Sequence, residues 1–165
     1  ITNYNSNLIN IFNNTLFEYT NLIKANLPTG IIHGDLFTDN VLFYKGEISG
    51  FIDFYYASKD YLISDIAIVI ISWCFTSKND KAVELDIKKV RMLLSSYHKI
   101  RNISYSELIS LNIVCKMYCI RFFLTRLIDK KSQKDSKKVL TKDPNEYIHK
   151  LLYFNKNTIN FEQVI

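Results

Sequence analysis

The sequence predicts a mainly helical domain that carries one small β-hairpin. Apolar residues recur every three or four positions over most of the chain, as they do along amphipathic helices. One short segment near the start is instead rich in β-branched and aromatic residues. The 165 residues are enough for one domain with a hydrophobic core. A helix, a hairpin and then more helices leave too little sheet for a self-contained α/β fold.

The first helix is expected over residues 5–26, and Pro28 marks its end. A stub of strand follows at residues 31–32. Two runs of β-branched and aromatic residues come next, at 41–44 and 48–52. A Lys-Gly-Glu turn separates them, which predicts a β-hairpin.

Two further helices are expected after the hairpin. Residues 60–75 are almost all apolar, which indicates a buried helix whose one awkward acid is Asp65. Residues 81–101 alternate an apolar side with a lysine-rich side, which indicates an amphipathic helix.

The last part of the chain predicts two more helices and a loop. Ser104 and Glu107 form a capping-box pattern that begins a long helix, through about residue 127. Residues 130–142 are polar and lysine-rich, so we expect a mobile loop there. A final helix is expected from Asp143-Pro144 to about residue 154, with the proline in its first turn.

The net charge of +5 suits an enzyme that handles phosphates as well as a protein that binds nucleic acid or a membrane surface. The lysine-rich residues 130–142 have no aromatic residues at stacking spacing and include acids, so we expect no nucleic-acid partner. The longest apolar run, residues 66–75, is well short of the ~20 residues that cross a bilayer, so we expect no membrane partner.

The cysteines indicate the redox compartment. Cys74, Cys115 and Cys119 are an odd number and contain no CxxC pair. Cys115 and Cys119 lie four apart on one face of an expected helix, where a disulfide is awkward. Buried free thiols are the better interpretation, and they favour a cytoplasmic protein.

Residues 31–57 hold an unusual concentration of acids and turn residues. His33, Asp35 and Asn40 form the pattern H-G-D-L-x-x-x-N directly before the first hairpin strand, and Asp53 follows the second. Because a hairpin folds back on itself, Asp53 should return close to Asn40. Asp35 would then face a substrate hydroxyl while Asn40 and Asp53 hold a divalent cation, as phosphoryl transfer requires. The alternative is a hairpin whose polar residues serve turns and caps.

HGDLFTDN and GFIDF resemble the catalytic loop and the metal-binding Asp segment of the aminoglycoside phosphotransferase/choline kinase superfamily, distant relatives of protein kinases. The segments DLFTDNVLF, IDFYYA and DIAIVIISWC are similar to bacterial homoserine kinases of the aminoglycoside-phosphotransferase-like type, and RFFLTRLID and DPNEY resemble their C-terminal helices. The resemblance covers residues 27–151. It implies that residues 1–165 form the C-terminal catalytic lobe of a protein-kinase-like α+β fold.

The resemblance also implies roles for five residues. Asp35 is the catalytic base or orienting acid for the acceptor hydroxyl, and His33 belongs to the same catalytic loop, which it braces by hydrogen bonding. Asn40 and Asp53 bind Mg²⁺ and through it the nucleotide. Asp65 must be paired to be tolerated in an apolar helix, and we expect it to accept hydrogen bonds from the backbone of the catalytic loop.

The acceptor site is less defined by the sequence. A carboxylate-bearing acceptor favours a bidentate arginine, and Arg121 is our candidate, against a purely structural salt bridge. Arg121 and Arg126 lie five apart and hence on different faces of the helix, so at most one need point into the cleft. Tyr56 and Trp73 are candidate walls of this cleft, although core packing is the commoner role of such residues.

The implied reaction is ATP plus L-homoserine to ADP plus O-phospho-L-homoserine, with Mg²⁺ as the cofactor. The four glycines form no phosphate-binding loop pattern. We therefore expect that the N-terminal lobe covering ATP is absent from this chain, which makes a separate N-terminal lobe a candidate partner. We also expect that this truncated or split part has little activity alone. The alternatives are a kinase for choline, a methylthioribose-like sugar or an aminoglycoside, and a non-catalytic remnant. The basic helices favour an acidic or zwitterionic acceptor.

Overall fold

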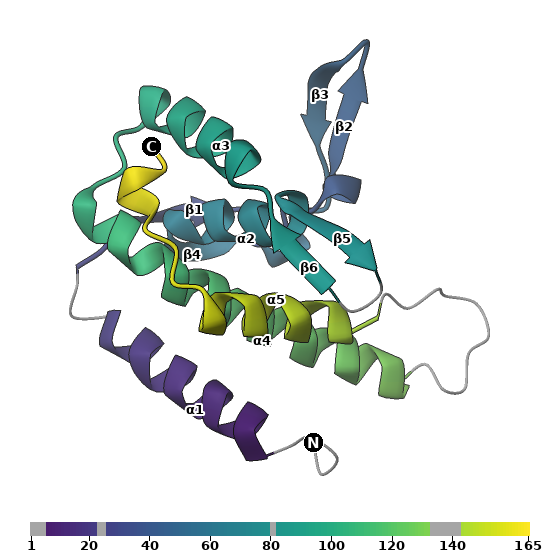
Figure 1. The fold of residues 1–165 in the computed structure, drawn as a ribbon. Coiled ribbons are helices and arrows are strands. Elements are labelled where there is room, and N and C mark those ends of the chain that lie inside the picture. The colour runs from purple at the N-terminus through teal and green to yellow at the C-terminus, as the bar shows by residue number, and fades with distance from the viewer. Residues whose placement is uncertain (1–5, 23–25, 80–81, 133–142) are drawn as a thin grey trace.

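The protein is described by a computed structural model that covers residues 6–22, 26–79, 82–132 and 143–165. Its long helix α4 (Tyr105–Ser132) is the centre of the fold, and it buries most of its apolar side chains. Three other helices pack against it: α1 (Ser6–Asn21), α2 (Ile63–Trp73) and α5 (Asn145–Lys156) (Figure 1).

The core follows from the apolar patterns of these helices. Seven residues of α2 are buried, and the six apolar ones among them pack into one cluster with the buried side of α4. Among the described residues, α4 alone is long and apolar enough to cross a bilayer by length and composition. Because most of its apolar stretch is buried within the domain, we interpret α4 as a core helix.

The capping box at the start of α4 is confirmed. Ser104 Oγ accepts a hydrogen bond from the Glu107 amide at 3.3 Å, and the Glu107 carboxylate accepts one from the Ser104 amide at 2.9 Å. Arg101 adds two hydrogen bonds to the same carboxylate, at 2.6 and 3.2 Å. The helix start is therefore fixed by a buried acid with several donors.

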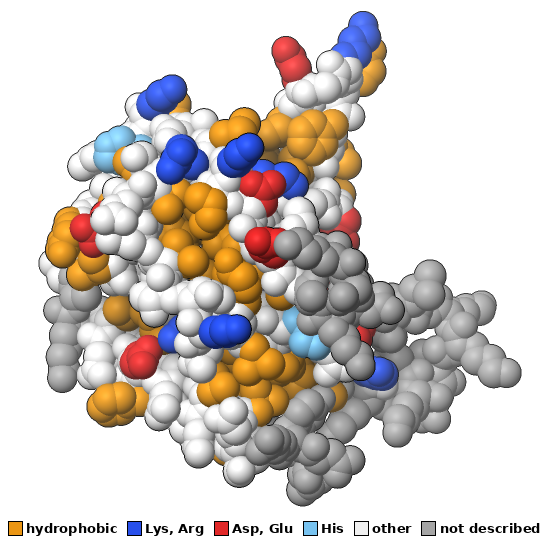
Figure 2. All heavy atoms as spheres, in the orientation of Figure 1, with side chains coloured by type: hydrophobic (Ala, Val, Ile, Leu, Met, Phe, Trp, Pro, Cys, Tyr) orange, Lys and Arg blue, Asp and Glu red, His pale blue; other side chains and the backbone are white. Residues whose placement is uncertain are grey.

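Three small antiparallel strand pairs lie around the helices. The expected hairpin is confirmed as β2 (Val41–Tyr44) and β3 (Glu47–Phe51), and it projects from the domain (Figure 1). Its apolar side chains are largely exposed, as the orange side chains at the top of Figure 2 indicate. The other two pairs are β1 (Thr29–Ile32) with β4 (Ser58–Tyr61), and β5 (Phe75–Asn79) with β6 (Ala82–Leu85).

The structure corrects three element boundaries. The start of the helix expected at residues 60–75 is instead the end of strand β4, and its last residue begins β5. The helix expected at 81–101 begins later, as α3 (Ile87–Ile100), because residues 82–85 pair as β6. Asp86 caps α3 through hydrogen bonds from Lys88 and Lys89 amides.

The C-terminal elements agree with the sequence in outline. Residues 130–132, which were expected in a loop, belong to α4. The rest of that expected loop, residues 133–142, lies outside the described residues. Helix α5 begins at Asn145, directly after Pro144. Cys74, Cys115 and Cys119 are free and buried, as expected.

Candidate active site

The H-G-D-L segment forms a tight loop directly after β1. Gly34 has a φ of 76°, which favours glycine, and a Cβ at this position would lie 2.6 Å from the Tyr56 carbonyl oxygen. The loop continues into a 3-10 turn, Thr38–Asn40, that leads into β2. The backbone around Gly34 therefore packs directly against the segment that follows Asp53.

Asp65 holds the loop from α2, as expected. It lies in the first turn of α2, and its carboxylate accepts hydrogen bonds from the His33 amide at 2.7 Å and the Gly34 amide at 2.9 Å. Bonds to a charged acceptor are stronger than neutral ones, so the apolar helix tolerates this acid and the loop is fixed.

His33 connects the loop to the hairpin. Its Nδ1 accepts a hydrogen bond from the Asp35 amide at 3.3 Å, and its Nε2 lies 2.9 Å from the Ile52 carbonyl oxygen. Because a backbone amide only donates, Nδ1 is unprotonated and Nε2 donates to Ile52. The ring also packs on Phe54, with 4.5 Å between centroids. These contacts agree with the bracing role expected for His33.

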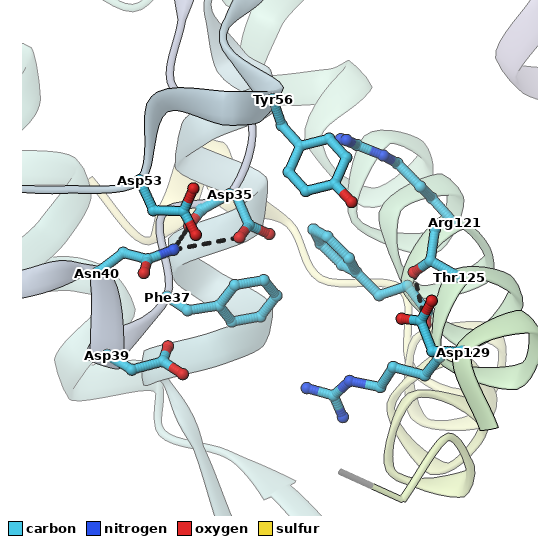
Figure 3. Close-up of a pocket in the computed structure, with 11 residues that line it drawn as sticks. Asp35, Phe37, Asp39, Asn40, Asp53, Tyr56, Arg121, Thr125 and Asp129 are labelled. Carbon is cyan, nitrogen blue, oxygen red and sulfur yellow. Dashed lines mark hydrogen bonds between the residues drawn. The ribbon is translucent and has the colours of Figure 1, made fainter. Parts of the chain in front are cut away.

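The structure brings Asp35, Asn40 and Asp53 together. The Asn40 amide nitrogen donates to the Asp35 carbonyl oxygen at 2.8 Å and to the Asp35 carboxylate at 3.1 Å. The Ile52 amide donates to the Asn40 carbonyl oxygen at 3.1 Å, which returns the chain to the loop just before Asp53. Figure 3 shows the two carboxylates beside the Asn40 amide. The expected return of Asp53 to Asn40 is confirmed.

The environment of Asp35 favours its neutral form. Burial raises the pKa of this carboxyl, and the nearby Asp53 carboxylate raises it further. The Asn40 hydrogen bond and the Arg121 guanidinium oppose this, but the pKa remains above its usual value. An aspartate with a raised pKa in a cleft is a candidate proton acceptor.

The donor set beside Asp35 fits a hard divalent cation. Both bonds from the Asn40 amide nitrogen go to Asp35, so the side-chain oxygen of Asn40 is left for a ligand, next to the Asp53 carboxylate. No group of three or more His, Cys, Asp or Glu that could hold a metal occurs in the described residues. Two oxygen ligands suit Mg²⁺, which keeps waters and binds substrate phosphates.

A cleft of about 230 Å³ opens in front of Asp35, and α4 forms its far wall (Figure 3). Both Arg121 and Arg126 line it, so the expectation that one of them at most need point there is corrected. The two start about 140° apart around a helix with 3.6 residues per turn, but long side chains reach the cleft from both sides.

The two arginines have different partners. Arg121 donates to the Gly34 carbonyl oxygen at 3.1 Å, and its guanidinium lies 5.4 Å from the ring centroids of Tyr56 and Tyr118. Arg126 donates to the Glu146 carboxylate at 2.7 Å and to the Tyr147 hydroxyl at 3.2 Å, and both of these residues lie on α5. Arg121 therefore contacts the loop, whereas Arg126 joins α4 to α5.

Of the two aromatic candidates, only Tyr56 is a cleft residue in the described structure. Trp73 instead donates its indole N–H to the Leu36 carbonyl oxygen at 3.1 Å, behind the loop. The sequence reasoning missed Thr125 and Asp129, which line the cleft from α4. Thr125 and Asp129 follow Arg121 at successive intervals of four residues, which places all three on one helix face, a signal that would have identified them.

The comparisons with known proteins agree with this geometry. A sequence profile described as "Phosphotransferase enzyme family" matches residues 13–87. A homoserine kinase of Bartonella henselae is 45% identical over 129 residues, which are 78% of this chain and 39% of that protein. A homoserine kinase of Rhodospirillum rubrum is 42% identical over 127 residues, 77% of this chain and 38% of that protein. A homoserine kinase of Bartonella tribocorum is 42% identical over 136 residues, 82% of this chain and 41% of that protein.

The chain spans about two fifths of the length of these curated relatives. The profile match includes the catalytic-loop pattern, Asp53 and Asp65. The mostly helical fold with small antiparallel strand pairs is consistent with a C-terminal lobe. Residues 13–87 thus match the phosphotransferase enzyme family, whose fold is kinase-like, and most of the chain is similar to homoserine kinases.

Proposed function

We propose that this chain carries the catalytic and acceptor-binding part of a homoserine kinase, which transfers the γ-phosphoryl group of ATP to the hydroxyl of L-homoserine. One observation carries the proposal. Asp35, Asn40 and Asp53 meet at one cleft in a chain that is 42–45% identical to three homoserine kinases over most of its length.

Asp35 orients the acceptor hydroxyl and accepts its proton as the hydroxyl oxygen attacks the phosphoryl group. Asn40 supports this role because its two hydrogen bonds fix the Asp35 carboxylate relative to the loop backbone. His33 acts through the loop and does not react, since both of its ring nitrogens have partners within the loop and hairpin. Arg121 and Tyr56 contact the acceptor from the other side of the cleft.

Asn40 and Asp53 hold Mg²⁺, which supplies charge neutralisation at the phosphates of ATP. The Asn40 amide lies beside the Asp53 carboxylate (Figure 3), and both hydrogen bonds of its nitrogen go to Asp35, so its oxygen keeps lone pairs for the cation. An Asp53→Asn substitution should weaken Mn²⁺ binding, measured by water-proton relaxation, whereas Glu47→Gln, exposed at the start of β3 and outside the cleft, should not.

The chain acts as a C-terminal lobe, and ATP is covered by a lobe that this sequence does not contain. The exposed apolar hairpin supports this part of the proposal, because an apolar surface of this kind marks an interaction site. Its large exposed side chains are Leu42, Phe43, Tyr44, Ile48 and Phe51. We therefore expect little activity from the isolated chain.

The cysteines bear on location. The buried free thiols favour a cytoplasmic protein.

A chimera tests the proposed function. The N-terminal part of the Bartonella henselae homoserine kinase, up to its matched region, is joined to this chain, and ADP formation is measured with L-homoserine, choline, methylthioribose and an aminoglycoside. We expect L-homoserine to be preferred and Asp35→Asn to abolish turnover. A preference for another acceptor, or full activity of the Asp35→Asn chimera, would contradict the proposal.

A further inference from the structure

A second cavity, of about 220 Å³, lies beside the catalytic cleft between α1, β4 and α4. It has one acid, one base and several hydroxyl groups among its walls, an unusual set for a packing defect. The residues that line it are Tyr19, Ser58, Asp60, Met117, Tyr118 and Arg121.

Arg121 belongs to both cavities. Its bond to the Gly34 carbonyl oxygen places it one residue from Asp35 along the loop. A guanidinium has five N–H donors in a planar fork, so this bond leaves donors for a carboxylate. A ligand whose hydroxyl lies at Asp35 and whose other end lies in the second cavity would therefore pass Arg121.

Asp60 supplies the opposite charge. Its carboxylate accepts hydrogen bonds from the Tyr61 amide at 2.7 Å and from the Tyr118 hydroxyl at 3.0 Å, which hold it in one orientation. Each carboxylate oxygen accepts more than one hydrogen bond, so Asp60 retains acceptor capacity for an ammonium group.

The phenols of this cavity remain neutral hydroxyl groups. Burial raises the pKa of Tyr118 to about 12, and burial together with the Asp60 carboxylate raises the pKa of Tyr19 further still. Neutral phenol oxygens accept hydrogen bonds from an ammonium group without adding charge. The cavity therefore offers one negative group, one positive group and neutral hydroxyl groups.

We propose that this second cavity binds the α-amino-acid end of the acceptor, with its ammonium group at Asp60 and its carboxylate at Arg121. This proposal rests on the proposed function. It names Asp60 and Arg121 as the residues that select an amino-acid acceptor over other alcohols. An alcohol without an ammonium group leaves the Asp60 carboxylate without its counter-charge, and a simple amine leaves Arg121 without its carboxylate. The side chain of the acceptor then extends from Arg121 toward Asp35.

The other charged pair on the cleft wall is less suited to this task. Arg126 uses both terminal nitrogens of its guanidinium for Glu146 and Tyr147, and its guanidinium carbon lies 4.4 Å from the centroid of the Tyr147 ring. Asp129, one helical turn away, is exposed. Arg126 is therefore occupied in joining helices.

Titration calorimetry on the 165-residue chain tests the site without any need for turnover. We expect L-homoserine to bind, and Asp60→Asn to weaken binding about tenfold or more, since a charge-assisted contact is lost. The control variant Glu162→Gln, on the exposed C-terminal turn and outside both cavities, should bind within about twofold of the unmodified chain. Tyr19→Phe, which removes one hydroxyl, should weaken binding by a smaller factor and serves if Asp60→Asn does not fold.

Acceptor analogues identify the group that Asp60 contacts. 4-Hydroxybutyrate lacks the ammonium group, so it should bind the unmodified chain weakly and should lose little further affinity in Asp60→Asn. No binding of L-homoserine, equal binding by the Asp60→Asn and unmodified chains, or a larger loss in Glu162→Gln would overturn the inference.

The two proposals fail separately. Asp35→Asn should abolish turnover in the chimera yet leave L-homoserine binding to the chain largely intact. Asp60-dependent binding in a chimera that phosphorylates another acceptor would retain the site and contradict the proposed function. Turnover of L-homoserine with no effect of Asp60→Asn on its binding would support the proposed function and contradict the site at Asp60.

Discussion

Gly34 and Tyr56 approach each other so closely that a Cβ at position 34 would lie 2.6 Å from the Tyr56 carbonyl oxygen. The φ of 76° at Gly34 adds a second restriction, because side-chain-bearing residues rarely adopt it. The catalytic-loop backbone and the segment after Asp53 are thus packed without space for a side chain.

Gly34→Ala should therefore destabilise the fold by about 1–3 kcal/mol, since it adds strain and a backbone clash at once. The matched control is Gly50→Ala in β3, where a Cβ would meet nothing within 4 Å. Urea denaturation of both variants measures the free energy of unfolding. Equal stability of the two variants would contradict the packing described around Gly34.

Asp65→Asn should loosen the catalytic loop. An amide side chain accepts at one position, so one of the His33 and Gly34 amides would face an N–H group instead of an oxygen. We expect a loss of about 2 kcal/mol and faster hydrogen exchange at these two amides. Asp39→Asn, on the exposed 3-10 turn, should leave both measurements unchanged. Unchanged exchange at His33 and Gly34 in Asp65→Asn would show that other contacts hold the loop.

Much of the candidate site could be predicted because its signals are local. The hairpin is specified by its turn and its β-branched runs, and a hairpin necessarily returns Asp53 toward Asn40. Asp65 is an acid in an apolar helix, which demands a hydrogen-bond partner nearby. Each inference needs a short stretch of chain and one physical rule.

The missed features depend on contacts between distant segments. Strands β1 and β4 pair Thr29 with Tyr61, and most of the site residues lie between these two strands in the sequence. Strand β4 has the polar sequence SKDY, which shows no apolar alternation. Helical spacing separated Arg121 from Arg126, but it carried no information on the reach of each side chain. A polar four-residue strand such as β4 leaves too little pattern for a sequence-based prediction.

The capping box of α4 should contribute a pH-dependent part of the stability. Glu107 is 1% exposed; its burial alone would raise the pKa, but the hydrogen bonds from Arg101 and Ser104 outweigh this and hold the pKa below its usual value. A carboxyl with a lowered folded-state pKa stabilises the fold at neutral pH, and this stabilisation is lost as the pH falls through that pKa.

Glu107→Gln should accordingly cost about 3 kcal/mol at pH 7, because it leaves Arg101 without its buried counter-charge. The difference from the unmodified chain should shrink in acid, where Glu107 itself is protonated. Glu162→Gln, on the exposed C-terminal turn, is the control and should be neutral. A Glu107→Gln deficit that stays constant down to low pH would contradict the ionic role.

Asp35→Asn should stabilise the fold while removing activity. Burial and the Asp53 carboxylate raise the pKa of Asp35, so the folded state binds its proton more tightly than the unfolded chain does. At pH 7 the ionised carboxylate therefore lowers stability, and this penalty disappears as the pH falls and the carboxyl is protonated. The neutral amide of the variant avoids the penalty at every pH. It also lacks the proton acceptor, which should reduce turnover in the chimera by about 10²–10⁴-fold.

Thermal unfolding of the two chains at pH 7 and at about pH 3 measures the stability change. We expect the Asp35→Asn chain to have the higher Tm at pH 7 and the two Tm values to converge in acid. In the unmodified chimera, kcat/KM should fall as the pH decreases through the pKa of Asp35, because the protonated carboxyl accepts no proton. A lower Tm for Asp35→Asn at pH 7 would mean that the hydrogen bond from Asn40 outweighs the burial of the charge.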